Sequence, residues 1–313
     1  MPELILHHYP MSPFAEKVRR VLAYKQLPWK SVLIPAVMPK PDLIALTGGN
    51  RKTPMLQIGA DIYCDTALIC DTLEHLQPEP TLYPPHEKGL ARIMAQWADH
   101  QLFWSAMSHS LRPQGAAQLL ATQPLDVAKA FAQDRAGMRV AVPRVGPSDA
   151  AGACQSYLRR LANMLEDHAY LLGEQPCLAD FAAYHPLWFI RVQTPVMAEV
   201  LDATPAVVAW MDRMAAFPDD AIETLDATEG IAIAAAATAQ SVDGLTFQDD
   251  HGIALGSQVT ISGDTFGPEP TEGTLVAATR MHYTVRRNDE RAGTVHVHFP
   301  RIGYVLRAAP SKA

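Results

Sequence analysis

Two changes in hydrophobic periodicity along the chain constrain its fold more than any other feature. Up to about residue 78, short strand-like and helix-like patterns alternate, and helical patterns then follow one another to about residue 240. Beyond 245, apolar residues recur at every second position in short segments separated by Gly, Pro, Asn and Asp. Helices and strands bury apolar faces with different periods, so each of the three patterns predicts a part of the chain with different secondary structure.

We therefore predict a protein of mixed class, α/β followed by all-α and then small β. A chain of 313 residues is also too long for one typical core. The predicted limits are an α/β domain in 1–78, an all-helical bundle domain in 86–240 and a small antiparallel, barrel-like β domain in 245–313. The segment QPEPTLYPP at 77–85 is typical of a linker.

The first 78 residues contain the patterns of a compact α/β domain. Phe14, Val18, Val21 and Leu22 recur at helical spacing, and strand-like segments lie on either side. The predicted elements are strands at 3–8 and 31–35, helices at 13–25 and 65–76, and a hairpin at 54–64. The order is strand, helix, strand, a loop, then two strands and a helix.

Composition argues against several classes of protein. The formal net charge is −7, whereas a general nucleic-acid binder needs a basic surface, so we expect no nucleic-acid partner. No apolar run is long enough to cross a membrane, and the first ten residues lack the pattern of a signal peptide. The four cysteines form no CxxC pair, which favours a reduced cytoplasmic protein without disulfides or a structural zinc.

The stretch YPMSPFAEKVRR at 9–20 contains the most informative single residue, Ser12. Its hydroxyl can cap the following helix by accepting hydrogen bonds from first-turn N–H groups, and Pro13 suits the first helical position. The same place, at the positive end of a helix, also suits a catalytic hydroxyl that stabilises an anion. The local pattern leaves both interpretations open.

Three segments give the chain a resemblance to the serine-type cytosolic glutathione transferases. YPMSPFAEKVRRVLAYKQLPW (9–29) resembles the first strand-to-helix turn of that family. NRKTPMLQIGADIYCDTALICDTLEHL (50–76) resembles its cis-proline and helix-start segment, and PCLADFAAYHPLW (176–188) resembles a segment of its helical domain. The resemblance covers roughly residues 3–225 and implies a thioredoxin-like domain followed by a helical domain. The C-terminal β region lies outside the family's usual architecture.

In that family the serine faces the glutathione sulfur, which implies that Ser12 is catalytic and donates its O–H to the thiolate. Lowering a thiol pKa of about 8.5 by about two units requires roughly 2.7 kcal/mol. A hydrogen bond to a charged group contributes about 1.5–3 kcal/mol, and a helix N-terminus roughly 0.3–1 kcal/mol, so the two together suffice. Tyr9 is a competing hydroxyl. Because residue 12 is not cysteine, we do not expect the thiol exchange of glutaredoxins.

The second segment implies which residues hold the peptide of glutathione. Pro54 matches the cis-proline, and Thr53 before it would bind the cysteinyl part through its backbone. Asp65 would pair with the ammonium and Thr66 with the γ-glutamyl carboxylate, although local rules also explain this pair as an ordinary helix cap. The family commonly has Glu-Ser at these positions, so Asp-Thr is a departure that puts a shorter carboxylate side chain beside the ammonium.

Basic residues before Pro54 are candidates to meet the glycyl carboxylate: Lys52 is best placed, and Lys40 and Arg51 are further candidates. The second substrate would lie between the Ser12 turn and the first helices of the second domain. The candidates to line that pocket are Phe14, Trp97, Phe103, Trp104, His109 and Trp188. Aromatic residues on helices are, however, more often ordinary core residues.

Two further features are interpreted as structural. The family caps one buried helix with an S/T-x-x-D box, which implies a folding role for Asp180, and Cys177 in the first position should weaken that cap by about 1 kcal/mol. His296 and His298 share one face of a strand, and we favour an exposed strand face over a metal site because no further ligands converge in sequence. The β region would dock on the helical domain, shape the cleft or bind a partner.

The resemblance implies a glutathione transferase that attacks a small, mostly apolar electrophile, as in detoxification. Glutathione would be the co-substrate, no metal would be needed, and the protein would be a cytoplasmic homodimer without nucleic-acid or membrane partners. One alternative is a transferase-like scaffold that binds a partner and has little catalytic activity, which the extra β region motivates. Another is a glutathione-dependent isomerase, dehalogenase or peroxidase.

Overall fold

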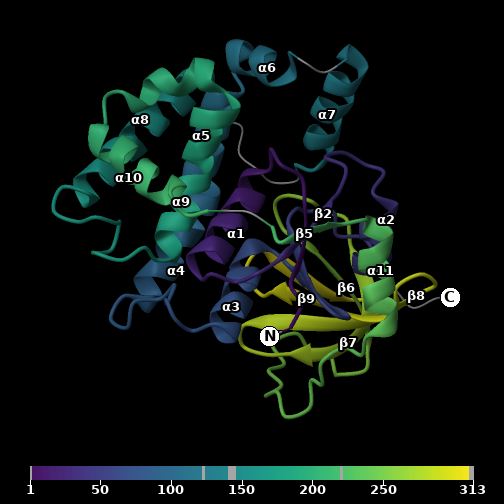
Figure 1. Ribbon diagram of the computed structural model, residues 1–313. Helices are drawn as coiled ribbons and strands as arrows, with labels where there is room; N and C mark the ends of the chain where they lie inside the picture. Colours follow the sequence, from purple (N-terminus) through teal and green to yellow (C-terminus); the bar gives the residue numbers. More distant parts are fainter. Residues whose placement is uncertain (1, 122–123, 140–145, 219–220, 310–313) are drawn as a thin grey trace.

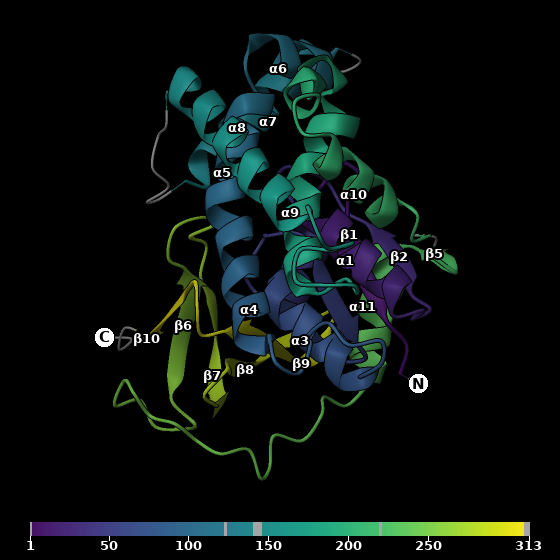
Figure 2. The ribbon, with the colours of Figure 1, turned by 90° about the vertical axis from the view of Figure 1, so that its left-hand side faces the viewer.

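The molecule consists of a helical part and a long twisted sheet that meet along one side. A computed structural model describes residues 2–121, 124–139, 146–218 and 221–309. Most helices gather on one side of the molecule and the strands on the other, with the helices of residues 13–24 and 66–76 between them (Figures 1 and 2). The helices of residues 41–47 and 227–236 lie together on the far face of the sheet (Figure 1). Among the helices in these ranges, none combines the length and apolar character needed to cross a membrane.

The first domain has the predicted thioredoxin-like arrangement. Its elements are β1 (Ile5–His8), α1 (Pro13–Tyr24), β2 (Lys30–Leu33), α2 (Pro41–Thr47), β3 (Met55–Ile58), β4 (Asp61–Cys64) and α3 (Thr66–Leu76). β1 is parallel to β2 and antiparallel to β3, and β4 is antiparallel to β3. α2 lies in the segment predicted to be a loop. It is too short for a clear periodic pattern, but it begins at Pro41 and ends before Gly48, whose φ is +80°.

α1 lies between the sheet and the helical domain. Val18, Val21 and Leu22 are fully buried, as their spacing predicted. They belong to an apolar core that fills the space between one face of the sheet and the helices. A second core lies on the other face of the sheet and includes residues of α2 and of the C-terminal strands.

The second domain is helical, as predicted. Its elements are α4 (Lys88–Trp97), η1 (Ala98–Leu102), α5 (Phe103–Ser110), α6 (Pro113–Leu120), α7 (Leu125–Gly137), α8 (Pro147–Met164), α9 (Leu178–Trp188), η2 (Phe189–Gln193), η3 (Pro195–Leu201) and α10 (Pro205–Ala215). Every residue of α9 is buried. At its start, the Asp180 carboxylate accepts from the N–H groups of Cys177 and Leu171 and from Trp210 Nε1, each at 2.9 Å. Three donors thus converge on one buried carboxylate.

After α10 the chain returns to the sheet. β5 (Glu223–Leu225) is parallel to β2, and α11 (Ala227–Ala236) packs against α2 and the sheet. Both elements fall within the range 86–240, which the sequence pattern assigns to the helical domain. The pattern therefore did not predict that the chain returns to the sheet before residue 240. α11 approaches closely because its residues are small: Gln57 Nε2 donates to Gly230 O at 2.8 Å, and a Cβ at Gly230 would lie 3.2 Å from His7 Cε1.

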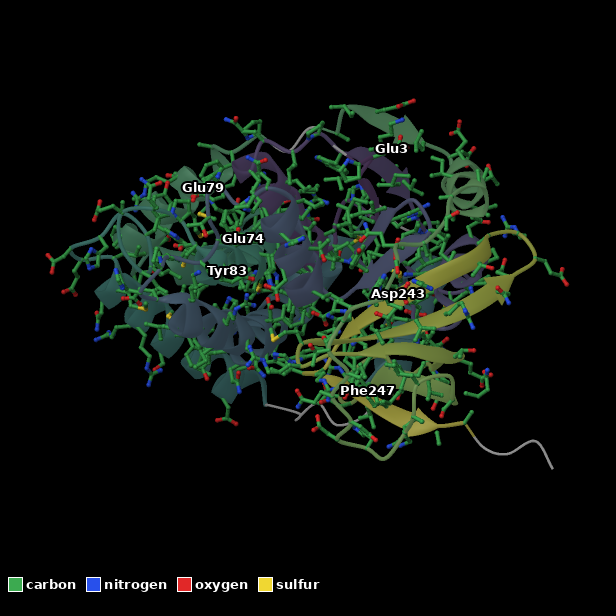
Figure 3. All side chains as sticks on the ribbon, turned by 90° about the horizontal axis from the view of Figure 1, so that it is seen from below. Glu3, Glu74, Glu79, Tyr83, Asp243 and Phe247 are labelled. Atoms are coloured by element: carbon green, nitrogen blue, oxygen red, sulfur yellow. The ribbon has the colours of Figure 1, made fainter. Side chains whose placement is uncertain are left out.

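The C-terminal strands extend the sheet of the first domain. They are β6 (Gln258–Gly263), β7 (Thr271–Ala278), β8 (His282–Asp289), β9 (Gly293–Pro300) and β10 (Tyr304–Ala308). They are antiparallel to one another, as predicted, and β9 is parallel to β4, which gives the order β10-β6-β7-β8-β9-β4-β3-β1-β2-β5. The connection from α11 to β6 contains Asp243 and Phe247 (Figure 3) and contacts these strands at Gln248, whose N donates to Ala278 O at 2.8 Å.

The prediction of an exposed face for His296 and His298 is wrong for His298, which is 7% exposed. Its Nε2 donates to Asp61 Oδ1 at 2.8 Å, its Nδ1 lies 2.9 Å from Thr284 Oγ1, and its ring stacks on Tyr63 with centroids 4.5 Å apart. The face is covered because β9 pairs with β4 instead of ending the sheet. Over the described ranges, no group of three or more His, Cys, Asp or Glu is arranged to hold a metal.

Candidate functional site

A cavity of about 450 Å³ lies where the first domain, the helical domain and the C-terminal strands meet. Its walls come from the turn before α1, the loop before β3, the start of α3, the helices α4, η1 and α5, and loops of the C-terminal region. The predicted site residues that line it are Ser12, Phe14, Lys40, Lys52, Thr53, Pro54, Asp65, Thr66, Phe103 and Trp104. Tyr9 and Arg51, the further candidates, also line it.

Three predicted pocket residues do not line the cavity. Trp188 is buried, with its ring centroid 6.0 Å from Arg19 Cζ. Trp97 packs edge-on against α8, and His109 Nε2 lies 3.1 Å from a backbone carbonyl of η3. These side chains occupy the helical core, which sequence periodicity cannot distinguish from a neighbouring cavity wall.

Ser12 has the geometry of a helix cap at the edge of the cavity. Its backbone is extended, with φ −72° and ψ 118°, and its Oγ accepts from Ala15 N at 3.2 Å. The side chain is held in place, with the residue only 2% exposed, and no acceptor for its O–H proton lies among the described residues. The two interpretations of Ser12 therefore share one geometry, since a capping oxygen can still donate its proton.

The loop before β3 is braced by a lysine. The Thr53–Pro54 peptide bond is cis, as the resemblance implies. Lys40 Nζ donates to Arg51 O and to Thr53 Oγ1, each at 3.4 Å. Burial, together with the positive charge of Arg135, lowers the pKa of Lys40 to about 8. A lysine with a titratable charge thus lies in the wall of the cavity.

Asp65 and Thr66 begin α3. Asp65 has φ +78°, a left-handed conformation uncommon for a residue other than glycine, and its Oδ1 accepts from Ala67 N at 3.0 Å. Thr66 Oγ1 accepts from Lys17 Nζ at 3.1 Å, so its own O–H proton can be donated into the cavity. The first turn of α3 therefore presents a hydroxyl at the N-terminus of a helix, an arrangement that favours a bound carboxylate.

A buried charge network beneath this turn was missed in the sequence. Lys17 Nζ donates to Asp99 Oδ2 at 2.6 Å, and His185 Nε2 lies 3.0 Å from Asp99 Oδ1. Burial lowers the pKa of Lys17, but Asp99 more than offsets this effect and the net direction is upward. Burial lowers the pKa of His185, whose ring packs on Phe14. In the sequence, this network is indicated only by Lys17, a charged residue beside the apolar face of α1. Its partner Asp99 is too distant along the chain to form a local pattern with it.

The C-terminal region contacts the loop that contains the cis-proline. Arg51 Nε donates to Glu269 Oε1 at 2.6 Å, and the Arg51 guanidinium also pairs with Asp134 of α7. The contact is so close that a Cβ added to Gly49 would lie 1.8 Å from Pro270 O. The shape of the loop thus depends on the C-terminal strands as well as on the first domain.

Lys52 also meets the C-terminal region. Its Nζ lies 4.0 Å from the centroid of the Tyr304 ring, a cation–π contact. Burial lowers the pKa of Lys52, and the carboxylates of Asp65 and Asp264 act in the opposite direction. Asp264 lines the cavity as well, so the C-terminal region contributes charge to the site.

Comparison with protein families identifies both main parts of the chain. Residues 6–81 match the N-terminal domain of glutathione S-transferases, and residues 147–218 match the C-terminal domain of the same family. The strands from β6 onward lie outside both matches.

Similar proteins extend this result. A GST-like protein from Pseudomonas syringae is 40% identical in sequence, with a TM-score of 0.80, over 99% of this chain and 100% of that chain. This likeness therefore includes the C-terminal strands. A glutathione S-transferase from Rhodospirillum rubrum, 20% identical with a TM-score of 0.53 over 69% of this chain and 89% of that chain, shares the fold.

Two curated proteins match parts of the sequence. FtsZ-localized protein A of Caulobacter vibrioides is 25% identical over 186 residues, which is 58% of this chain and 74% of that protein. Pyrimidodiazepine synthase of Drosophila melanogaster is 35% identical over 86 residues, which is 26% of this chain and 35% of that protein. The chain thus spans about a third of the length of the second relative.

Proposed function

The chain belongs to the glutathione S-transferase family, and from this premise we propose that it is an enzyme with glutathione as co-substrate. The reaction would be attack of the glutathione thiolate on a small, mostly apolar electrophile. One observation supports this most directly. Ser12, Thr53 and Thr66, each implied to contact a different part of glutathione, line the same cavity.

Ser12 would act by favouring the ionised thiol. The capping contact from Ala15 N uses a lone pair of the Ser12 oxygen, so the hydroxyl proton stays available for the thiolate. The N-terminus of α1 adds partial positive charge at the same point. The thiol proton passes to water. The sulfur electron pair then forms the carbon–sulfur bond, and the leaving group departs with the electrons of the bond that breaks.

The remaining residues would orient the peptide. Thr66 would donate its hydroxyl proton to the γ-glutamyl carboxylate, because its oxygen already accepts from Lys17. Asp65 would pair with the ammonium, and the backbone of Thr53 would bind the cysteinyl unit. Lys40, together with Lys52, would attract the glycyl carboxylate. Holding the thiol against the electrophile in this way makes the reaction effectively unimolecular.

We also propose that the protein is a cytoplasmic homodimer, in which the first domain of one chain packs on the helices of the other, as is usual in the family. All four cysteines are free and buried, as expected in a reducing compartment. Leu90 and Ile93 leave apolar surface exposed on α4, which suits a protein interface. Sedimentation equilibrium would give a mass twice that of the 34.2 kDa chain.

A second candidate function is a partner-binding scaffold. The observation that favours it is the similarity to FtsZ-localized protein A, whose name describes where that protein is found and not a reaction. In this alternative the cavity would have little catalytic activity, and the surface would bind a protein. Fold alone does not decide between the two.

Calorimetry with glutathione and a conjugation assay with chlorodinitrobenzene separate these candidates. Binding together with conjugation above the uncatalysed rate is the expected result. Absence of glutathione binding at millimolar concentration would contradict the enzyme and favour the scaffold. Binding without conjugation would direct the search to a panel of isomerase, dehalogenase and peroxidase substrates.

A further inference from the structure

Aromatic rings form a continuous series along one wall of the cavity. Phe14, two residues after Ser12, has its ring centroid 4.7 Å from that of Phe103. The Phe103 and Trp104 centroids are 5.0 Å apart, and the Trp104 and Phe266 centroids 5.4 Å apart. All of these residues line the cavity. The series thus runs from the turn that carries Ser12, across α5, to the loop between β6 and β7.

A single arginine lies at the far end of the series. Arg139 Cζ is 4.9 Å from the centroid of the Trp104 ring, and the Arg139 backbone forms a β-bridge with Phe266. Next to it, Gly267 N donates to Met138 O at 2.8 Å, which fixes the C-terminal loop to the end of α7. The guanidinium is therefore positioned by its stacking on Trp104 and by the backbone contacts of Met138 and Arg139 with the C-terminal loop.

The charge of Arg139 is available to a ligand. Across residues 2–121, 124–139, 146–218 and 221–309, no carboxylate forms an ion pair with Arg139, whose side chain is exposed at the cavity wall. By contrast, Arg51 and Arg135 in the same wall both pair with Asp134. The carboxylate nearest in sequence to Phe266 is Asp264, and Lys52 already interacts with it.

We propose that the loop between β6 and β7 completes an acceptor subsite for aromatic electrophiles that carry a carboxylate. This proposal rests on the proposed transferase function. The ring of the electrophile packs on Trp104 and Phe266. Its carboxylate pairs with the guanidinium of Arg139. Its reacting carbon points along Phe103 and Phe14 toward Ser12. A planar guanidinium suits a carboxylate because both present two atoms in one plane. An aromatic ring between aromatic walls gains offset or edge-to-face contacts.

The kinetic experiment compares para-chloro-meta-nitrobenzoate with the matching benzamide, each rate divided by the uncatalysed rate with glutathione. We expect kcat/KM to favour the benzoate about tenfold, as one hydrogen-bonded charge pair allows. Arg139→Gln should remove this preference by raising KM for the benzoate, whereas Arg139→Lys should retain part of it. Phe266→Ala should raise KM for both compounds. Arg160→Gln, on the exposed surface of α8, is the matched control and should change neither.

A binding experiment needs no turnover. The glutathione-saturated protein is titrated with the unreactive compounds meta-nitrobenzoate and meta-nitrobenzamide, and the affinity for each is measured. The affinity should be higher for the benzoate, and Arg139→Gln should remove this difference. Selective binding without conjugation would uphold the subsite and contradict the transferase. Conjugation of both compounds with no preference, or an equal effect of Arg139→Gln on both, would overturn the subsite and leave the transferase standing. Absence of binding and of turnover would overturn both.

Discussion

Lys17 Nζ lies 2.6 Å from Asp99 Oδ2, so a buried ion pair joins the first helix of the α/β domain to the helical domain directly beneath the cavity. The Lys17 side chain is fully buried and that of Asp99 is 12% exposed. Burial of two charges is costly and is repaid only while both partners are present. The pair therefore fixes the relative position of the two domains where the first turn of α3 begins.

Removal of one partner should destabilise the protein strongly. We expect Lys17→Met to lower the free energy of unfolding by roughly 3–5 kcal/mol, because it leaves the Asp99 carboxylate buried without its cation. Urea denaturation measures the change. The double variant Lys17→Met/Asp99→Leu should recover a large part of the loss, and Arg291→Ala, which breaks the exposed pair with Asp42, should cost less than about 1 kcal/mol. Equal losses in Lys17→Met and Arg291→Ala would contradict a buried pair.

Ser12→Ala should separate the capping role from the catalytic role. We expect turnover to fall on the order of 10²-fold, as for loss of one oxyanion-hole donor. Stability should fall by only about 1 kcal/mol, because one capping contact is lost. The ultraviolet absorbance of the bound thiolate reports the pKa of bound glutathione, which should rise in the variant. Ser156→Ala, at an exposed position of α8, is the control. A folded Ser12→Ala protein with normal turnover would leave Ser12 as a cap alone.

Binding of the glycyl carboxylate should depend on the charge of Lys40. Its lowered pKa of about 8 means that the ammonium loses its proton as pH rises through that value. A carboxylate is attracted only by the protonated form, so affinity should fall as pH rises, by about tenfold once the charge is lost. Calorimetry with S-methylglutathione measures this without ionisation of a thiol. Lys40→Arg keeps its charge and should show a flat profile, and a falling profile in this variant would refute the assignment.

The contact between the cis-proline loop and the C-terminal region predicts a strong effect of one methyl group. A Cβ at Gly49 would lie 1.8 Å from Pro270 O, so Gly49→Ala has to displace one backbone from the other. We expect a loss of about 1–3 kcal/mol in stability and weaker glutathione binding, measured by thermal unfolding and calorimetry. Gly89→Ala is the control. It lies in α4 with nothing within 4 Å of the added atom and should stabilise by roughly 0.5–1 kcal/mol. Unchanged binding in Gly49→Ala would show that the loop tolerates the displacement.

Local patterns predicted most of the elements of the fold. The spacing of Val18, Val21 and Leu22 gave the buried face of α1, and the alternation beyond 245 gave antiparallel strands, because both signals depend on neighbours in sequence. The pairing of β9 with β4 was not predictable in this way. His298 was assigned to an exposed face because nothing near it in sequence indicates Asp61 and Tyr63.

The candidate site divides in the same manner. Ser12, Pro54 and Thr66 lie in short segments whose pattern carries both the turn and the resemblance, and the structure brings them to one cavity. Trp188 was predicted to line the pocket but is buried in the helical core. Aromatic residues in a core and at a pocket have the same helical spacing, so the pattern cannot separate them. Phe266 and Arg139 carried no signal, since their role depends on a loop that crosses to another domain.

The pairing of β4 with β9 also determines when the sheet of the first domain can be fully formed during synthesis. Strand β4 leaves the ribosome long before its partner strand β9, because the whole helical domain lies between them in the sequence. Until then the nascent thioredoxin-like domain carries an open edge, which is a template for wrong partners. Formation of such a distant pair is slow, because the intervening chain must close as a loop. During synthesis the backbone edge of β4 therefore stays open until β9 has been made and has paired with it.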